Sequence, residues 1–244
     1  MSILRGWMAV ALVLGAVQTA APQKDREPAP LAQAERKGPG DGNSRIGRLL
    51  AVQGGGQAHF LKINIRGLPF MGSAEAKVTM IEFSDYQCFF CRRHDRQVAP
   101  RIVKDYVESG QVKYVFADFP LASHAGASKA AQAAHCAGDQ GKYWEMNDLL
   151  FRHPQSLTQT TIKAFGSSLK LDTQALLDCV ESGKYAQKVR DGLSQGKRVG
   201  VRGTPSFFFG LTDKTQPTLR VRQTLTGAHP YPAFQRLIEE LLAQ

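Results

Sequence analysis

The stretch FSDYQCFFCRRH, Phe83 to His94, constrains the fold of this chain most strongly, because it joins two elements of different periodicity through a pair of cysteines. The apolar, β-branched run KVTMIEF before it predicts a buried strand over 77–83. The next residues, Cys91 to Ser109, have the spacing of a helix. A kink is expected at Pro100, and the helix is expected to end at Gly110. The next run, QVKYVFADF, predicts a second strand over 111–119. A strand, a helix and a strand in this order predict a parallel crossover.

Cys88 and Cys91 lie where the first strand gives way to the helix, and this position favours redox chemistry. A helix that begins near Cys88 directs its unpaired amides and its positive dipole end at the Cys88 sulfur, which stabilises the thiolate. The i, i+3 spacing places Cys91 one turn on, close enough to close a disulfide. The positive charges of Arg92 and Arg93 are unfavourable near the positive end of the helix dipole, and a neighbouring anion would offset this cost.

Two alternatives to a redox dithiol stay open on the residues alone: half of a zinc site, or an inert structural disulfide. Zinc sites pair one C-x-x-C with a second pair of ligands at short range, but Cys136 and Cys179 stand singly and far away. A reactive helix start is a poor location for an inert disulfide. No metal site is therefore predicted.

The chain before the predicted domain has the layout of an exported protein. Residues 1–21 carry Arg5, then a short apolar run and small residues, which is typical of a secretory signal peptide. The alternative is an uncleaved N-terminal anchor, since no clean cleavage motif is present. Residues 22–58, with four prolines and a glycine run, predict a flexible linker. The folded part is then expected in the periplasm or another extracytoplasmic, oxidising compartment, either soluble or tethered by its N-terminus.

The remaining chain, 59–244, predicts a small mixed sheet interrupted by helices, an α/β architecture. HFLKINI alternates as a strand does, and PSFFFG and TLRVRQTLTG predict two more strands before a closing amphipathic helix over 230–242. No convincing strand occurs in a helical insertion over about 125–198. Its expected helices run over 126–137, 142–151, 160–169, 173–182 and 185–196.

The net charge argues against one class of function. The 31 Lys and Arg against 21 Asp and Glu give a formal charge of +10, but the basic residues are scattered rather than gathered into a stripe. A nucleic-acid partner is therefore not expected. The scattered basic residues instead predict a solvated basic surface.

Three segments resemble the DsbA-like thiol-disulfide oxidoreductases of the thioredoxin superfamily, in the bacterial exported branch with a helical insertion. The segments are VTMIEFSDYQCFFCRRH, VFADFPLASHAGASKAAQAAHCAGDQGKYWEMNDLLF and GVRGTPSFFFG, and GAHPYPAF resembles the last strand-to-helix junction of the family. The resemblance runs from about residue 60 to the end. It implies a thioredoxin-like fold with a helical insertion domain, disulfide exchange with other proteins, and no metal or organic cofactor.

The resemblance also implies roles for particular residues. Cys88 becomes the attacking nucleophile and Cys91 its buried partner. Glu82 falls where such proteins keep a buried carboxylate, and a lone acid in TMIEF is expensive to bury unless it handles protons. The alternative is a strand acid that faces solvent. Thr204 and Pro205 match the cis-proline loop of the family, which presents its backbone to the substrate. The alternative is an ordinary turn with a trans peptide bond.

Phe89 and Phe90 depart from the histidine that strongly oxidising members carry between their cysteines. They offer neither a hydrogen bond nor a charge, so the helix end is expected to lower the Cys88 pKa by only about one unit. Arg92 or His94 adds to that only where the geometry permits. The sequence therefore predicts that the protein is a moderate oxidant, weaker than the members that carry the histidine. The rings either grip apolar segments of an unfolded substrate, or one of them packs under the cis-proline loop.

Cys136 and Cys179 form the second cysteine pair, inside the predicted helical block. Export and an even cysteine count favour a structural disulfide between them, and two buried free thiols are the alternative.

The sequence thus predicts an exported thiol-disulfide oxidoreductase that acts on unfolded or cysteine-containing secreted proteins. A membrane redox partner is expected to recycle the dithiol. The competing hypothesis is a redox-inert binding module or holdase that uses the same fold and the apolar surface at Phe89 and Phe90.

Overall fold

The computed structural model describes residues 61–154 and 157–244. The predicted signal peptide (1–21) and linker (22–58) lie outside the described residues. Within the described ranges, no helix is both long and apolar enough to cross a membrane.

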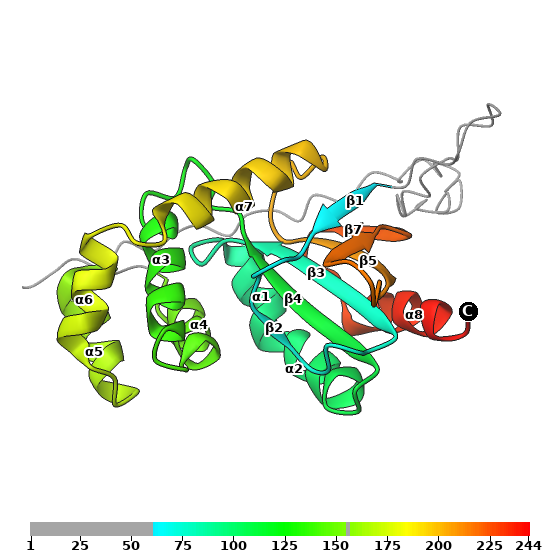
Figure 1. Ribbon diagram of the computed structural model, residues 1–244, viewed down its shortest axis with the longest axis horizontal. Coiled ribbons are helices and arrows are strands. Elements are labelled where there is room, and N and C mark those ends of the chain that lie inside the picture. The colour runs from blue at the N-terminus through cyan, green and yellow to red at the C-terminus, as the bar shows by residue number, and fades with distance from the viewer. Residues whose placement is uncertain (1–60, 155–156) are drawn as a thin grey trace, which may run out of the picture. The chain divides into compact units, whose positions relative to one another are not determined.

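A five-stranded mixed sheet, in the order β2-β4-β3-β5-β7, organises the part of the chain that the structure describes (Figure 1). Only β3 and β4 run parallel within it, and the other neighbours are antiparallel. A separate antiparallel pair joins β1 to β6. The strands are β1 (Lys62–Asn64), β2 (Phe70–Met71), β3 (Val78–Ser84), β4 (Val112–Asp118), β5 (Ser206–Leu211), β6 (Thr218–Arg220) and β7 (Gln223–Thr226).

The predicted parallel crossover is present, with β3 and β4 paired in register from Val78 opposite Val112 to Ser84 opposite Asp118. Every residue of β3 is buried, as expected for a central strand that is covered on both faces. The side chains alternate between two hydrophobic clusters: Met80 packs with the α8 side and Ile81 with the opposite side. The same alternation directs Glu82 to the face that Met80 occupies.

Helices cover both faces of the sheet and build the insertion (Figure 1). Val98, Ile102 and Phe234 pack on the Met80 face, while Leu193 and Val199, at the end of α7, pack on the Ile81 face. The helices are α1 (Phe89–Gln97), α2 (Ala99–Ile102), the π-helical η1 (Val103–Val107), α3 (Ala127–Gly138), α4 (Tyr143–Arg152), α5 (Gln159–Ser168), α6 (Thr173–Glu181), α7 (Ala186–Arg198) and α8 (Tyr231–Leu242).

The single kinked helix expected up to Ser109 is instead three consecutive pieces: α1, α2 and η1. The first break falls at Val98, with φ −119°, and Pro100 lies in the first turn of α2. Proline has no N–H to donate to the turn before it, so the first helix ends just upstream. Gly110 follows η1 with φ +74°, in the left-handed region that suits a helix end.

The segment expected as one strand, TLRVRQTLTG, is two strands that pair with different partners. The Val221 amide donates to the Leu61 carbonyl at 2.8 Å, and the next amide, of Arg222, donates to the Phe209 carbonyl at 2.8 Å. The chain therefore changes partner between these two residues. Gly210 permits the close approach, because a Cβ there would lie 2.2 Å from the Arg220 carbonyl oxygen.

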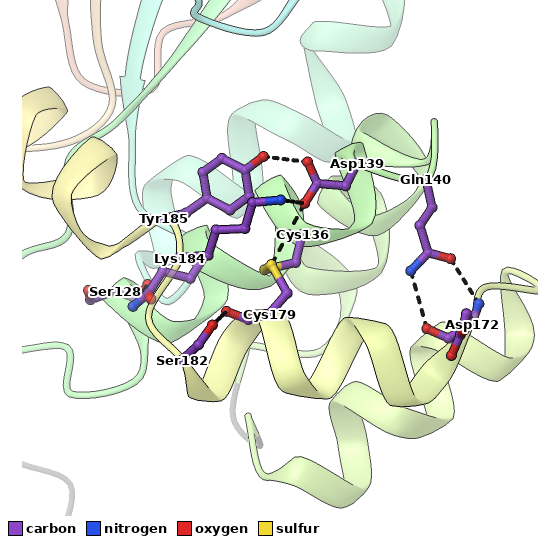
Figure 2. Close-up of a disulfide and its surroundings, with 10 residues drawn as sticks. Ser128, Cys136, Asp139, Gln140, Asp172, Cys179, Ser182, Lys184 and Tyr185 are labelled. Atoms are coloured by element: carbon purple, nitrogen blue, oxygen red, sulfur yellow. Dashed lines mark hydrogen bonds and ion pairs between the residues drawn. A yellow bond between two sulfur atoms is a disulfide. The ribbon is translucent and has the colours of Figure 1, made fainter.

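A disulfide between Cys136 and Cys179 joins α3 to α6 within the insertion (Figure 2). Cys136 is buried among the alanines of α3, and Cys179 is half-buried. Beside the bridge, the Asp139 carboxylate accepts hydrogen bonds from Lys184 at 2.8 Å and from the Tyr185 hydroxyl at 2.5 Å (Figure 2). The bridge and this cluster hold α3, α6 and the start of α7 together.

Replacing both bridge cysteines, as C136A/C179A, is expected to lower the free energy of unfolding by about 4 kcal/mol, because the open chain gains the entropy of an uncrosslinked loop. Urea unfolding measures the loss, with both proteins carrying C88A/C91A so that only the structural bridge differs. A loss below about 1 kcal/mol would contradict a stabilising role.

Candidate active site

The two cysteines of the C-x-x-C motif lie at the start of α1, directly after the buried strand β3. Cys88 is the residue that caps α1, and its own amide donates to the Asp85 carbonyl at 3.1 Å. Cys88 is 6% exposed and Cys91 is fully buried, and both are free thiols. The Cys88 sulfur therefore faces the unpaired amides of the first helical turn, which is the arrangement that the sequence predicts.

The two thiols have opposite pKa shifts. A hydrogen bond from the Cys91 thiol is the largest cause that lowers the Cys88 pKa, to about 5, against the effect of burial. The Thr204 side chain and the backbone amides of Cys91 and Phe90 lower it further. Burial raises the Cys91 pKa well above its ordinary value, so this thiol keeps its proton and donates it. The Cys88 shift exceeds the expected one unit because the helix end acts together with these donors.

The Thr204–Pro205 peptide bond is cis, and its loop packs directly against Cys88. In the neutral form the Cys88 thiol donates to the Thr204 carbonyl at 3.4 Å. The Thr204 hydroxyl is buried and has no hydrogen-bond partner among the described residues, so it is available to donate to the thiolate. The alternative of an ordinary trans turn is wrong.

The T204V variant is expected to raise the Cys88 pKa by about one unit, because it removes a hydrogen-bond donor to a charged group and keeps the shape of the side chain. Thiolate absorbance near 240 nm against pH measures the shift. T204S keeps the hydroxyl and is the matched control. An unchanged pKa in T204V would show that the hydroxyl does not reach the sulfur.

Arg92 and Arg93, the basic residues after the dithiol, lie over aromatic rings of the same helix. The Arg92 guanidinium lies 5.5 Å from the centroid of the Phe89 ring, and that of Arg93 lies 5.1 Å from the centroid of Phe90. Cations over aromatic faces are a favourable arrangement of their own. Neither arginine is among the largest causes of the Cys88 pKa shift.

His94 adds no charge to the dithiol either. Its ring is fully buried between Phe207 and Phe234, with centroid distances of 4.5 and 4.9 Å. Burial lowers its pKa to about 3, so the imidazole is neutral at physiological pH. His94 therefore adds no charge, and the largest stabilising contributions to the thiolate come from thiol, hydroxyl and amide donors.

Phe89 and Phe90 are both exposed, at 59% and 50%, and their rings meet edge to face at 5.5 Å. Neither ring is buried beneath the cis-proline loop, so that alternative is wrong. The two aromatic side chains stand beside the dithiol on the first turn of α1.

Glu82 is buried, with 3% exposure, on the Met80 face of β3. Its carboxylate accepts a hydrogen bond from the Tyr114 hydroxyl, and the same hydroxyl lies 3.2 Å from His94 Nε2. Burial is the main reason that its pKa rises to about 7. The charge of Glu82 is also one of the causes that raise the Cys91 pKa, which places the acid within electrostatic reach of the dithiol. The alternative that Glu82 faces solvent is wrong.

Tyr114 and His94 complete this buried cluster, and the sequence reading did not assign them there. Tyr114 comes from β4, where it pairs with Met80 and shares its face. The register of the two parallel strands would have been needed to place it, and the sequence pattern does not specify that register.

The E82Q variant is expected to remove a pH-dependent destabilisation. Between about pH 4.5 and 7 the folded state keeps the Glu82 proton that the unfolded chain releases, so the contribution of Glu82 to wild-type stability falls as pH rises through this window. The fall relative to E82Q is about 3 kcal/mol. Urea unfolding at pH 4.5 and pH 8 measures it. The exposed-acid variant E108Q should keep the wild-type slope, and an identical slope in E82Q would contradict the raised pKa.

Two further residues that sequence reasoning missed fix the loop before the dithiol. The buried Asp85 carboxylate accepts from the Leu121 amide at 2.7 Å and lies 2.9 Å from His124 Nδ1. The Gln87 side chain bonds the Gly126 amide at 2.7 Å and the Pro154 carbonyl at 2.9 Å. Residues before the nucleophile thereby clamp the active-site loop to the insertion. Polar residues in the stretch SDYQ were the only sequence signal for this role.

A redox-competent cysteine pair at a helix start, above a buried acid and against a cis-proline, defines a thioredoxin-like protein. Within the described ranges, no group of three or more His, Cys, Asp or Glu side chains is arranged to hold a metal ion.

Comparison with known proteins agrees with this class. Residues 66–239 match the family described as thioredoxin. Disulfide bond formation protein D of Bacillus subtilis is 25% identical over 154 residues, which are 59% of this chain and 68% of that protein. Na(+)/H(+) antiporter NhaA 1 of Salinispora arenicola is 32% identical over 138 residues, which are 56% of this chain. The match spans only 21% of the length of that antiporter.

Solved structures show the same fold. Alpha-DsbA1 of Wolbachia pipientis aligns with a TM-score of 0.65 at 25% identity and covers 73% of this chain and 92% of its own. Oxidised BdbD from Bacillus subtilis aligns with a TM-score of 0.65 at 22% identity, over 76% of this chain and 98% of its own. The chain belongs to the thioredoxin family, and it shares its fold with alpha-DsbA1 and BdbD.

Proposed function

We propose that this protein exchanges disulfides with other proteins through Cys88 and Cys91. One observation carries the proposal: Cys88, at a helix start and against the cis-proline loop, has a pKa lowered to about 5, while the Cys91 pKa is raised by burial. A disulfide exchanges by attack of a thiolate and departure of another, so one stabilised and one protonated sulfur suit the two steps.

In the oxidising direction, a client thiolate attacks the Cys88 sulfur of the Cys88–Cys91 disulfide. The Cys88–Cys91 bond breaks, a client–Cys88 bond forms, and the electron pair leaves on Cys91. A second client thiolate then attacks the client sulfur of the mixed disulfide and releases Cys88 as the stabilised thiolate. The client gains one disulfide and the protein ends as a dithiol, so two electrons pass from client to protein.

Glu82 donates and accepts the Cys91 proton within this scheme. With a pKa of about 7 it is partly protonated near neutral pH, and it donates a proton to Cys91 as that sulfur leaves. In the reverse direction the Glu82 carboxylate accepts the Cys91 proton, and the resulting thiolate resolves the mixed disulfide. The buried position of Cys91 keeps solvent protons away, which gives an internal acid a role.

We infer a moderate oxidant. Stabilisation of the thiolate stabilises the reduced protein and makes the disulfide more oxidising. A Cys88 pKa of about 5 lies between ordinary thiols and the strongest oxidants of this fold, near 3.5. Phe89 and Phe90 withhold the hydrogen bond or charge that a histidine between the cysteines would add.

The proposed place of work is an oxidising, extracytoplasmic compartment such as the periplasm. The Cys136–Cys179 disulfide supports this, since structural disulfides persist where thiols are not kept reduced. Clients would be cysteine-containing secreted proteins, and a membrane redox partner would return the dithiol to its disulfide form. The exposed Phe89 and Phe90 and the Thr204–Pro205 backbone offer the client a contact surface next to Cys88.

The C91A variant tests the exchange chemistry. It is expected to accumulate mixed disulfides between Cys88 and its clients, because Cys88 can still attack a client disulfide while the Cys91 thiolate that would release the client in this direction is absent. Non-reducing gels of cells that express C91A, with and without reductant, measure the trapped complexes. The C88A variant, which retains Cys91, is the matched control and should trap none.

An absence of trapped complexes in C91A, together with suppression of client aggregation that survives C88A, would contradict the proposal. That pair of outcomes would support the redox-inert binding module or holdase instead.

A further inference from the structure

Five side chains of α1 form an arginine–phenylalanine surface next to the dithiol: Phe89, Phe90, Arg92, Arg93 and Arg96. Phe89, Phe90, Arg93 and Arg96 are exposed and Arg92 is half-buried. Arg92 lies over the Phe89 ring and Arg93 over the Phe90 ring, so each exposed ring carries a cation on its face. Apolar area and positive charge are thus interleaved within two helical turns of the nucleophile.

The three arginines of this surface lack an acid partner at ion-pair distance in the parts of the chain that the structure describes. Arg93 donates to the Ala228 carbonyl at 2.9 Å, which holds the side chain but does not neutralise it. Asp95 is the acid on the same helix, and burial is the main reason that its pKa rises to about 7. The three arginines outnumber this one acid, so the surface keeps a net positive charge.

This charge opposes the helix that bears it. Cations in the first turns of a helix repel the positive end of its dipole. Arg92 and Arg93 lie over the Phe89 and Phe90 rings, and neither is among the largest causes that lower the pKa of the Cys88 thiol, so the Cys88 thiolate offsets little of this repulsion. The unbalanced cations therefore point to an anion from outside the chain.

The shape of the surface suits an extended polypeptide. Phe89, Arg92, Arg93, Arg96 and Gln97 line one shallow surface groove. A second groove, which shares Phe89 and Arg92, runs along Gln87, Ser123, His124, Ala125 and Pro154. Phe89 and Arg92 stand between the two grooves, at the first turn after Cys88.

We propose that the arginine–phenylalanine surface selects client segments that carry acidic residues within a few positions of the reacting cysteine. The inference rests on the proposed disulfide exchange and names its substrate class. Arginine guanidinium groups bind carboxylates through paired hydrogen bonds, and the rings cover the apolar residues between them. At about 1.5 Å per helical residue, Arg92 and Arg96 lie about 6 and about 12 Å along the axis from Cys88. An extended client covers that span in about two to four residues.

Two synthetic dithiol peptides test the proposal, identical except for Glu or Gln at the two positions that flank each cysteine. The oxidised full chain is mixed with each reduced peptide, and the second-order rate of peptide oxidation is measured. At low ionic strength the Glu peptide is expected to react about fivefold faster, as two or three exposed ion pairs allow. The ratio should fall towards one at high salt, because the pairs are exposed and screened.

Variants locate the effect on the surface. In R92Q/R93Q/R96Q the Glu-to-Gln rate ratio should fall to about one. The matched control is R190Q/K197Q/R198Q, which removes the same charge from exposed positions of α7 and should keep the wild-type ratio. A Cys88 pKa measured in each variant separates charge selection from a change in the nucleophile, since a pKa change alters both peptide rates alike.

The peptide rates distinguish failure of the acidic-client inference from failure of the proposed disulfide exchange. No reaction with either peptide would contradict disulfide exchange itself. Equal rates for the two peptides in the wild type, or an equal loss of the ratio in both triple variants, would overturn the acidic-client inference. Equal peptide rates together with arginine-dependent binding to vesicles of anionic phospholipid would assign the surface to a membrane and overturn it as well.

Discussion

The hydrogen bond from the buried Cys91 thiol to the Cys88 sulfur is the interaction on which the rest of the site depends. It is the largest cause of the lowered Cys88 pKa, and it exists only while Cys91 remains protonated. Burial secures that protonation, because an anion at the position of Cys91 would lack solvent and lie near the charge of Glu82. The fold thus divides two chemically identical thiols into a nucleophile and a proton donor.

The ionisable groups beneath the dithiol are buried as well. Burial is costly for a charged group, and these groups are close to neutral. Glu82 has a pKa of about 7, and His94 is uncharged because its pKa is about 3. Tyr114 satisfies one carboxylate oxygen and approaches the imidazole. An acid with this pKa gains or loses a proton near physiological pH at little cost, which an acid at its ordinary pKa would not do.

The order of elements, the parallel crossover and the helical insertion could be predicted from sequence, because strand and helix periods differ clearly in KVTMIEF and in the segments after it. The motif spacing likewise placed Cys88 at a helix start. Arg92 and Arg93 lie over the neighbouring Phe89 and Phe90 rings, a pairing that the sequence reading did not anticipate. Tyr114, Asp85 and Gln87 depend on strand register and on contacts across the insertion, which periodicity does not encode.

The clamp made by Asp85 and Gln87 has a consequence for motion. These two side chains tie the residues just before Cys88 to Leu121, Gly126 and Pro154, at the start of α3 and after the end of α4. An opening of the insertion that separates these segments therefore also releases the loop that positions the nucleophile. The hydrogen bonds that position the reactive sulfur are therefore the same ones that fasten the insertion to the sheet domain, and the geometry of the nucleophile depends on how the insertion is docked.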